Sequence, residues 1–286
     1  PEYVLNEVGG FTIHREGKRF YPVQVAEKGL AWLRMTASGT PGHSSLPDAD
    51  NALAALAWAI DRIASARLPW HVSPAARDFI GGMAAHIGAL GKWLSPLLFH
   101  PVLGPRLLPL AIPDENRRRS VEAVLRNTAN PTLIHEGGKK INVIPAKAAV
   151  DIDGRLAPGQ SAEYLIEELR IVLGDRKGER FQFEILSEKP ATVFSPDTSL
   201  FSVIRETLGR QDPEGIVVPS IIPGFTDSQN YARLGATCYG FYPLRLPEDL
   251  DFAALFHGDD ERIPLEGFRW GIETLGETLT RFAGAS

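Results

Sequence analysis

Two stretches near opposite ends of the sequence carry residues that could bind a divalent metal ion. Residues 256–264 read FHGDDERIP, so three acidic residues follow closely on His257. Neighbouring carboxylates can orient an imidazole and raise its basicity, which suits a metal ligand. Residues 3–10 read YVLNEVGG and place Glu7 after a strand-like run and before two glycines. Open α/β sheets bind their ligands at the carboxyl ends of their strands, and Glu7 is placed at such an end.

A third candidate is His43, within the sequence SGTPGHSS of residues 38–45. The glycines and the proline force a shaped loop, and the small neighbours leave the imidazole uncovered. Such an imidazole could donate a hydrogen bond to a developing oxyanion. Read alone, each candidate has a plainer interpretation: His257 in a solvated acidic loop, Glu7 at a surface turn and His43 as a solvated histidine.

The composition is that of an ordinary globular protein. The chain has 286 residues, 44% hydrophobic and 23% charged, which is enough for two domains with separate cores. A net charge of -5 provides no basic field for a phosphate backbone, which argues against nucleic acid as a partner. The single cysteine, Cys238, excludes a disulfide framework within the chain and a CxxC metal site. It fits a reducing compartment, so we expect a cytoplasmic protein.

Two further features of the sequence concern membranes and completeness. Residues 79–112 are apolar, but two cations, Lys92 and Arg106, and four prolines interrupt them before they reach the length of a membrane span. We therefore expect no membrane segment. The chain starts at Pro1, without an initiator Met and directly in a strand-like run. We therefore expect that an upstream part of a longer protein is absent.

The middle of the chain predicts a ferredoxin-like domain. The expected strands are residues 30–37, 146–156 and 181–186, and the expected helices are residues 51–66 and 161–173. With a further strand after residue 130, the order is strand, helix, strand, strand, helix, strand, which is the split βαβ arrangement. Residues 69–130 read as a helical insertion with no recognisable chemistry. The pair Glu167-Glu168 lies in the second helix, and we interpret both residues as solvated helix surface.

The flanking segments predict an α/β domain that the ferredoxin-like domain interrupts. After residue 190, helices are expected at residues 199–210 and 226–234, and strands at residues 215–219 and 236–242. The closing helix starts at Pro264 and has apolar residues at spacings of three and four, which predicts an amphipathic helix: Leu265, Phe268, Ile272, Leu275, Leu279 and Phe282. We therefore expect one domain from residues 1–28 and 189–286 and another from residues 29–188. This division places Glu7 and His257 in the same domain.

Six motifs in register resemble a known family. They read YVLNEVGG, GTPGHSS, GGKKINVIPA followed by DIDGRLAPG, PGFTDS, YGFYP and HGDDERI. In order and rough spacing they are similar to the aminoacylase and carboxypeptidase S family of co-catalytic zinc peptidases, which includes acetylornithine deacetylase and succinyl-diaminopimelate desuccinylase. The resemblance covers nearly the whole chain apart from the insertion. RNTANPTLIHEGGKKINVIP and the insertion are most similar to the carboxypeptidase S branch.

The resemblance implies part of an α/β catalytic domain, interrupted by an α+β ferredoxin-like lid that mediates dimerisation. It implies two zinc ions per complete subunit, with cobalt or manganese as alternatives that carboxylate and imidazole ligands tolerate. Glu7 matches the acidic ligand of one ion, and His257 matches the histidine ligand of the other. His43 matches the lid histidine that reaches the active site of the partner subunit and stabilises the tetrahedral oxyanion.

The resemblance also implies how a substrate is bound. Asn142 and Arg155 match lid positions that contact it, and Thr226 and Asp227 lie in a loop that lines the pocket. A guanidinium such as that of Arg155 can bind a terminal carboxylate through two parallel hydrogen bonds. The expected function is therefore a homodimeric, metal-dependent hydrolase that cleaves the amide bond of a peptide or an N-acyl amino acid with a free carboxylate.

Two departures from the family pattern qualify this function. The upstream half, with an HxD-type motif, a bridging Asp and a Glu-Glu pair, has no counterpart in the sequence, so we expect the fragment to be inactive alone. Gln229 stands where many relatives carry Arg. The alternative is a catalytically silent dimerisation or binding protein derived from the family. A Rossmann-type nucleotide binder ranks third, because the sequence has no GxGxxG, GKS or GKT loop.

Overall fold

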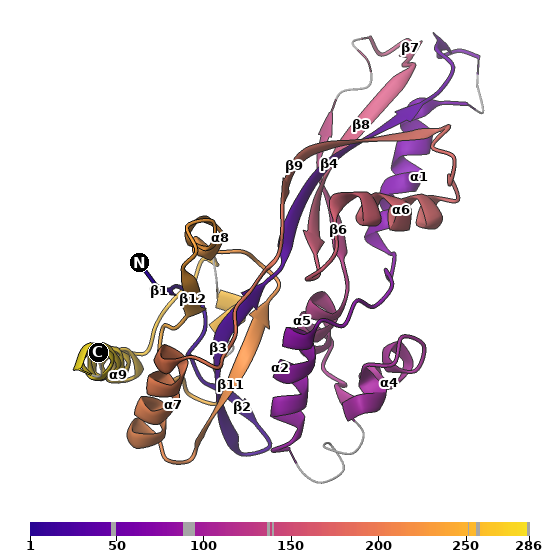
Figure 1. Ribbon diagram of the computed structural model, residues 1–286. Coiled ribbons are helices and arrows are strands. Elements are labelled where there is room, and N and C mark those ends of the chain that lie inside the picture. The colour runs from indigo at the N-terminus through magenta and orange to yellow at the C-terminus, as the bar shows by residue number, and fades with distance from the viewer. Residues whose placement is uncertain are drawn as a thin grey trace. The chain divides into compact units, whose positions relative to one another are not determined.

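The computed structural model describes residues 1–46, 50–87, 95–135, 138, 140–250, 252–255 and 258–284. The chain forms two compact units. Unit 1 comprises Pro1–Glu27, Ser73–Arg118 and Thr192–Ser286, and unit 2 comprises Lys28–Val72 and Arg119–Ala191. Each unit has a sheet and helices of its own (Figure 1).

Unit 1 contains a six-stranded mixed sheet around β3 (Lys18–Glu27). β11 (Gly215–Ile222) pairs with β3 in parallel along most of its length. Three shorter strands pair with β3 in the antiparallel sense: β2 (Ile13–Arg15), β10 (Thr192–Val193) and β12 (Thr237–Gly240). β1 (Tyr3–Asn6) pairs in parallel with β12, so that these two strands end side by side. The last eight residues of β3 are all buried, because the strand is covered on both faces.

The helices of unit 1 begin where the sequence supplies capping residues. α7 (Ser199–Gln211) is capped by the hydroxyl of Thr198, which accepts from the backbone N of Phe201. α2 (Pro74–Ala84) is capped by Ser73 and has proline at its start. Side-chain caps of this kind satisfy backbone donors that a helix leaves unpaired. The remaining helices of the unit are α4 (Gly104–Ala111), α8 (Ser228–Ala232), the 3-10 helix η1 (Phe252–Leu255) and α9 (Leu265–Gly284).

α9 buries only part of the face that its apolar residues define, since Phe268, Leu275 and Phe282 are half-buried. Its buried residues are Gly267, Gly271, Thr274 and Thr278. Leu265, Ile272 and Leu279 are 59%, 56% and 50% exposed. A Cβ added at Gly267 would lie 1.9 Å from the carbonyl oxygen of Arg245. The helix therefore packs through its backbone, and glycine allows an approach that a leucine stripe would prevent.

Asp212, which follows α7, forms ion pairs with two arginines of unit 1, Arg19 and Arg245. Its carboxylate is 2% exposed. It accepts from Arg19 Nε at 2.8 Å and Nη2 at 2.7 Å and from the Tyr21 hydroxyl at 2.8 Å, and Arg245 Nη2 lies 3.2 Å away. Burial alone would raise the pKa of Asp212. The hydrogen bonds from Arg19, Tyr21 and Arg245 outweigh burial and hold this pKa well below its usual range.

This depressed pKa predicts a loss of stability in acid. A carboxyl whose folded-state pKa lies below its unfolded value contributes stability above the unfolded pKa, here 3.8, and loses it as the pH falls. Between pH 5 and pH 3 the free energy of unfolding should therefore fall by about 1 kcal/mol through Asp212 alone. Urea unfolding at both pH values should show that the free energy of unfolding falls less between pH 5 and pH 3 for Asp212→Asn than for the native chain. An equal fall in the variant and the native chain would contradict this assignment.

Unit 2 is the predicted ferredoxin-like domain. Its antiparallel sheet has the order β6-β8-β4-β9. The four strands are β6 (Thr128–His135), β8 (Lys147–Leu156), β4 (Gly29–Ser38) and β9 (Phe181–Lys189). Together with α1 (Ala52–Ala64) and α6 (Ala162–Leu173), they follow one another as strand, helix, strand, strand, helix, strand. The split βαβ arrangement predicted from hydrophobic periodicity is confirmed.

Alternation along the central strands of unit 2 separates its two sheet faces. Leu33, Met35, Val150 and Ile152 are at most 1% exposed and pack with residues of α1 and α6 in one core. Burying such side chains contributes roughly 1.5–3 kcal/mol each. The intervening residues, among them Asp151, face the other side. As predicted, Ser161 caps α6 by accepting from the backbone N of Tyr164.

The segment expected as an insertion in the ferredoxin-like domain is divided between the units. Ser73–Arg118 belongs to unit 1, where α2 packs against β11 and β3. α5 (Glu115–Leu125) leads from there into β6 of unit 2. Residues 88–94 of the expected helical insertion lie outside the described residues. Sequence periodicity shows which residues form a helix, but not which sheet the helix covers.

Glu168 corrects an interpretation made from the sequence. The exposed fraction of Glu168 is 9%, whereas the Glu167 side chain is 60% exposed and pairs with Arg170. Glu168 Oε1 lies 2.5 Å from His71 Nε2, and Oε2 accepts from Asn127 Nδ2 at 3.0 Å. Glu167 is therefore exposed and Glu168 buried, because His71 and Asn127, near the two ends of the inserted segment, contact Glu168.

Lys28 is a second buried charge of unit 2. It is fully buried and donates from Nζ to the carbonyl oxygens of Ala123 and Arg126, both at 2.8 Å. Burial, together with the charges of Arg155 and Arg126, lowers the pKa of Lys28 to about 7, while the charges of Asp153 and Glu168 oppose this shift. The amine thereby caps the last carbonyls of α5.

Candidate functional site

The predicted metal ligand Glu7 follows β1 in a turn of unusual geometry. Val8, Gly9 and Gly10 have φ angles of 65°, 103° and 79°. Glycine adopts these values readily, but a β-branched valine does so only under constraint. Gly10 N donates to Pro22 O at 2.7 Å, and Gly9 O accepts from Tyr242 N at 2.8 Å. The turn is therefore fixed at both glycines, and the Glu7 side chain is exposed beside it.

Close backbone contacts explain the glycines on both strands at this point. A Cβ added at Gly9 would lie 2.5 Å from Gly240 O, and one added at Gly240 would lie 1.9 Å from Val8 O. Gly240 is the last residue of β12 and lies opposite Asn6 in the parallel ladder. The glycines of YVLNEVGG and YGFYP thus bring two backbones together beneath Glu7.

A chain of hydrogen bonds links Glu7 to a buried carboxylate. Asn6 Oδ1 accepts from Glu7 N at 2.8 Å, and Asn6 Nδ2 donates to Ser228 Oγ at 3.3 Å. Ser228 N donates to Thr226 Oγ1 at 3.2 Å. Thr226 donates from N and Oγ1 to Glu27 Oε2, at 2.7 and 2.8 Å. The strand end that carries Glu7 and the loop that carries Thr226 are thereby held together within unit 1.

Glu27 is a member of this site that the sequence analysis missed. It is the last residue of β3 and is fully buried. Burial raises its pKa, and the hydrogen bonds from Thr226 oppose this rise. In the described part of the chain, Glu27 Oε1 has no hydrogen-bond partner. The sequence signal for Glu27 was its position at the end of the apolar strand β3, because a buried carboxylate there needs hydrogen-bond partners.

The loop residues predicted to bind substrate lie in different environments. Thr226 is 5% exposed, and its hydroxyl is engaged with Glu27. Asp227 is exposed at the start of α8 and contacts the amide of Asn230 at 3.5 Å. Gln229 is 4% exposed, and neither its Oε1 nor its Nε2 finds a partner among the residues that the structure describes. An unpartnered buried amide is costly, so Gln229 is poised to bind a further polar group.

The second predicted metal ligand, His257, lies outside the described residues, so its distance from Glu7 is not defined. Among the residues that are described, no three His, Cys, Asp or Glu side chains are grouped so that they could hold a metal ion. Zinc needs about four ligands. The described donor set, with Glu7 as its one predicted ligand, is therefore incomplete for zinc.

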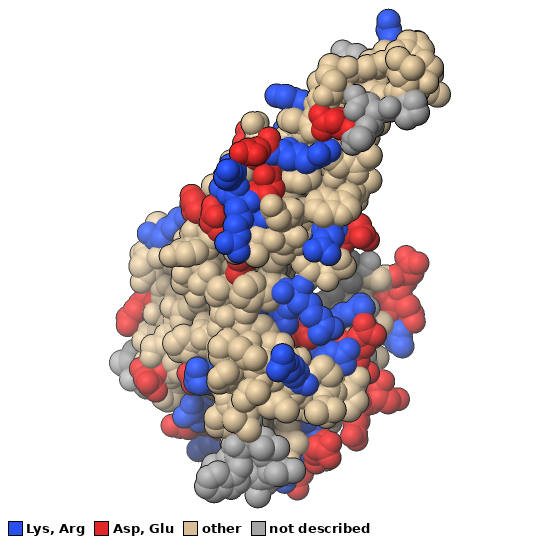
Figure 2. Space-filling model, turned by 90° about the vertical axis from the view of Figure 1, so that its right-hand side faces the viewer, with Lys and Arg blue, Asp and Glu red and all other residues tan. Residues whose placement is uncertain are grey.

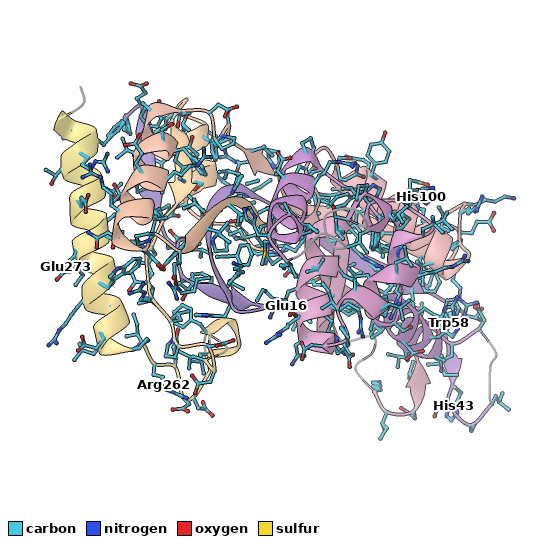
Figure 3. All side chains as sticks on the ribbon, turned by 90° about the horizontal axis from the view of Figure 1, so that it is seen from below. Glu16, His43, Trp58, His100, Arg262 and Glu273 are labelled. Atoms are coloured by element: carbon cyan, nitrogen blue, oxygen red, sulfur yellow. The ribbon has the colours of Figure 1, made fainter. Side chains whose placement is uncertain are left out.

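The lid residues His43 and Asn142 lie together at one end of unit 2. β5 (Gly42–His43) pairs with β7 (Val143–Ile144), and Ser44 N donates to Asn142 O at 3.2 Å. Both side chains are exposed, and Figure 3 labels His43 on this two-stranded ribbon. His43 Nδ1 accepts from Ser45 N at 3.2 Å. Nδ1 also lies 2.7 Å from Ser45 Oγ; where Nδ1 accepts both contacts, the proton of a neutral ring is on Nε2.

Arg155 lies near the other end of the same sheet. It projects from the open face of β8 and donates from Nε and Nη2 to Asp153 Oδ2, at 3.2 and 3.0 Å. In the ladder of β4 and β8, Arg155 is opposite Leu30, whereas Lys147 is opposite Ser38, just before the segment that carries His43. Eight residues of strand separate the two ends of β8, about 26 Å at 3.3 Å per residue.

Residues 25–180 match the family model of the M20 peptidase dimerisation domain. The chain belongs to the M20 peptidase family. Its match covers β4 to α6, which are the ferredoxin-like elements of unit 2 except β9. The family resemblance drawn from the sequence motifs is confirmed.

Curated M20 relatives align with most of the chain. The chain is 28% identical to a probable carboxypeptidase S-like 2 of Dictyostelium discoideum, over 86% of the chain and 46% of the relative. It is 31% identical to the N-fatty-acyl-amino acid synthase/hydrolase PM20D1 of Xenopus tropicalis, over 85% of the chain and 46% of the relative. The chain thus spans about half the length of these M20 proteins.

Solved structures of M20 peptidases share the fold. The metallo-carboxypeptidase Sso-CP2 of Sulfolobus solfataricus superposes with a TM-score of 0.54 and 17% identity, covering 98% of this chain and 63% of that one. The dipeptidase Dug1p of Saccharomyces cerevisiae gives a TM-score of 0.54 and 12% identity, covering 99% and 58%. At these identities the likeness concerns the mixed α/β fold.

Two further features of this M20 chain are its charged side chains and the character of its helices. Figure 2 shows lysine and arginine side chains close to aspartate and glutamate side chains on one face, in keeping with the net charge of -5. Within the described residues, no helix has the length and apolar character needed to span a membrane.

Proposed function

We propose that this chain is part of a metal-dependent hydrolase that cleaves the amide bond of a peptide or an N-acyl amino acid with a free carboxylate. The observation that carries the proposal is the Glu7 turn. An exposed carboxylate stands at the end of a parallel strand pair, on a backbone fixed by Gly9, Gly10 and Gly240. Val8, next to Glu7, has an unfavourable φ of 65°, and such strained residues cluster at functional sites.

Two relatives support the substrate class. One is named a carboxypeptidase S-like protein and another an N-fatty-acyl-amino acid synthase/hydrolase. The products of both reaction types include an amino acid with a free carboxylate. Arg155 suits this group, because its fork can bind a carboxylate through two hydrogen bonds. This fork donates to Asp153, which a substrate carboxylate would replace.

The geometry of unit 2 supports a homodimeric site. About 26 Å of strand separates the Arg155 end of β8 from the end next to His43 and Asn142. One small substrate cannot contact both ends of a single unit 2. We therefore assign His43 and Asn142 to the active site of a partner subunit, where His43 Nε2 donates to the developing oxyanion.

Enzymes of the M20 family use divalent metal ions, and we propose two zinc ions per complete subunit, with cobalt or manganese as alternatives. Bound metal would activate water and polarise the scissile carbonyl. Glu7 and His257 are the proposed ligands in this chain. His43 and Arg155 are assigned roles as hydrogen-bond donors.

The carboxylate role of Arg155 is tested by paired substrates in the full-length protein. Arg155→Ala should lower kcat/KM about tenfold for an N-acyl amino acid with a free carboxylate, because two charge-assisted hydrogen bonds are lost. The corresponding carboxamide should be hardly affected. Arg34→Ala provides the control, since Arg34 projects from the same open face of the sheet and pairs with Asp151. Equal losses on both substrates would remove this role.

The second candidate function is a catalytically silent dimerisation or binding module. It is favoured by the incomplete set of metal ligands among the described residues. Metal content separates the two candidates, because a complete M20 enzyme should retain about two ions per chain after dialysis. A full-length protein that binds no zinc, cobalt or manganese and cleaves no acyl amino acid would support the silent module.

A further inference from the structure

A hollow in unit 2 lies between α1, the end of α6 and the start of β9. Its volume is about 480 Å³, within the range of small-molecule pockets. Apolar side chains of Ala54, Ala55, Leu173 and Phe181 form its walls. At Gly174, which also lines it, an added Cβ would meet no atom within 4 Å. The hollow is therefore open space beside an apolar surface.

Trp58 provides the largest aromatic surface of the hollow. It projects from α1 and is 47% exposed (Figure 3). Its ring is stacked with that of Phe181, with centroids 6.2 Å apart and an interplanar angle of 21°. The guanidinium of Arg62 lies 5.9 Å from the centre of the indole. An exposed indole held in one orientation by its neighbours is a good contact surface for an apolar or aromatic group.

Two oppositely charged side chains, Asp175 and Arg180, line the hollow. The carboxylate of Asp175 is occupied by three backbone donors, the N–H groups of Glu179, Arg180 and Phe181, at 2.7–3.1 Å. Arg180 also lines the hollow, and its ion pair with Asp50 at 3.3 Å is exposed on both sides. An exposed pair of this kind contributes little, so a ligand carboxylate can compete for the guanidinium.

Arg62 adds a second cation. Within the described part of the chain, no carboxylate lies within ion-pair distance of Arg62, whose guanidinium contacts the face of Trp58. Arg180 thus lines the hollow and Arg62 lies against the Trp58 ring, while the backbone donors that hold Asp175 occupy its carboxylate oxygens. An anionic head and an apolar body match this arrangement.

We propose that this hollow binds a small organic carboxylate with an apolar, ring-containing body. The ring lies against Trp58 and Ala54, and the carboxylate accepts two hydrogen bonds from Arg180. None of these residues belongs to the proposed hydrolase site. The inference therefore stands or falls independently of the proposed function.

The test uses protein labelled with ¹⁵N at its tryptophans and titrated with 4-phenylbutyrate. The indole N–H resonance of Trp58, assigned by its loss in Trp58→Phe, should shift with a Kd on the order of 1 mM, as expected for a ligand of this size. Trp32 is the internal control. It is 48% exposed in the same unit, but lies on β4 with its indole N–H bonded to Asp153. Its resonance should not move.

Three comparisons decide the outcome. Arg180→Gln should raise the Kd about tenfold, whereas Arg176→Gln, at an exposed position of the same loop, should not change it. Ala54→Phe fills the hollow from an exposed position and should abolish the shift. The uncharged 4-phenylbutanol should bind at least tenfold more weakly. The proposal is overturned if the Trp58 resonance does not respond, if the alcohol binds equally well, or if the resonance shifts with protein concentration alone, which would indicate a second copy as the occupant.

Discussion

Replacing Glu168 with alanine should lower the free energy of unfolding by about 3 kcal/mol, because it removes one partner from a buried polar network. His71 Nε2 and Asn127 Nδ2 would lose an acceptor inside unit 2. Lys28, also fully buried in unit 2, would lose one of the two negative charges that favour its protonated form, while Asp153 would remain. Unsatisfied buried groups carry their full desolvation cost. Denaturant unfolding at neutral pH measures the difference.

The neighbouring residue supplies a matched control. Glu167→Ala removes a carboxylate from the same helical turn, but its ion pair with Arg170 is exposed, so the change should stay within about 0.5 kcal/mol. Both variants remove the same side chain at positions of similar helix propensity. If both cost the same, the His71–Glu168–Asn127 network contributes nothing, and the original interpretation of the pair as helix surface would be restored.

Gly240→Ala should cost about 3 kcal/mol and disturb the turn that carries Glu7. The new Cβ would lie 1.9 Å from Val8 O and 2.1 Å from Gln24 Oε1. Backbone has to move to relieve such an overlap, and overpacking of this kind is strongly destabilising. Val8 already holds a φ of 65°. Its displacement would also shift the adjacent Glu7, so the variant should lose metal affinity along with stability.

Gly209→Ala is the control for this substitution. Gly209 lies within α7 of the same unit, and a Cβ there would meet nothing within 4 Å. Alanine is favoured over glycine inside a helix by about 1 kcal/mol, so this variant should be slightly more stable than the native chain. Thermal or denaturant unfolding of the two variants should move in opposite directions. A Gly240→Ala protein as stable as the native chain would show that the two backbones are not in contact.

The ferredoxin-like fold of unit 2 could be predicted because its elements follow simple periodicities. β8 alternates apolar and charged residues, and α6 begins at a serine cap, so both were located within a residue. The order of the elements then determined the sheet, since few topologies suit that sequence of strands and helices.

Other features depended on contacts between distant residues and could not be predicted. Glu168 is buried by His71 and Asn127, which lie far from it in the sequence. Glu27 is stabilised by Thr226, 199 residues away. The pattern of neighbouring residues in the sequence does not show which distant residues will become hydrogen-bond partners. The proposed pairing of Glu7 with His257 remains a prediction, because His257 lies outside the described residues.

The packing of α9 reverses the usual pattern of mutational tolerance. On most surface helices the small and polar positions accept substitution and the leucines do not. In α9, Gly267 and Gly271 touch the backbone carbonyls of Arg245 and Pro243, while Leu265 and Ile272 are more than half exposed. Gly267 and Gly271 should therefore tolerate few substitutions. Leu265 and Ile272 should tolerate polar as well as apolar residues.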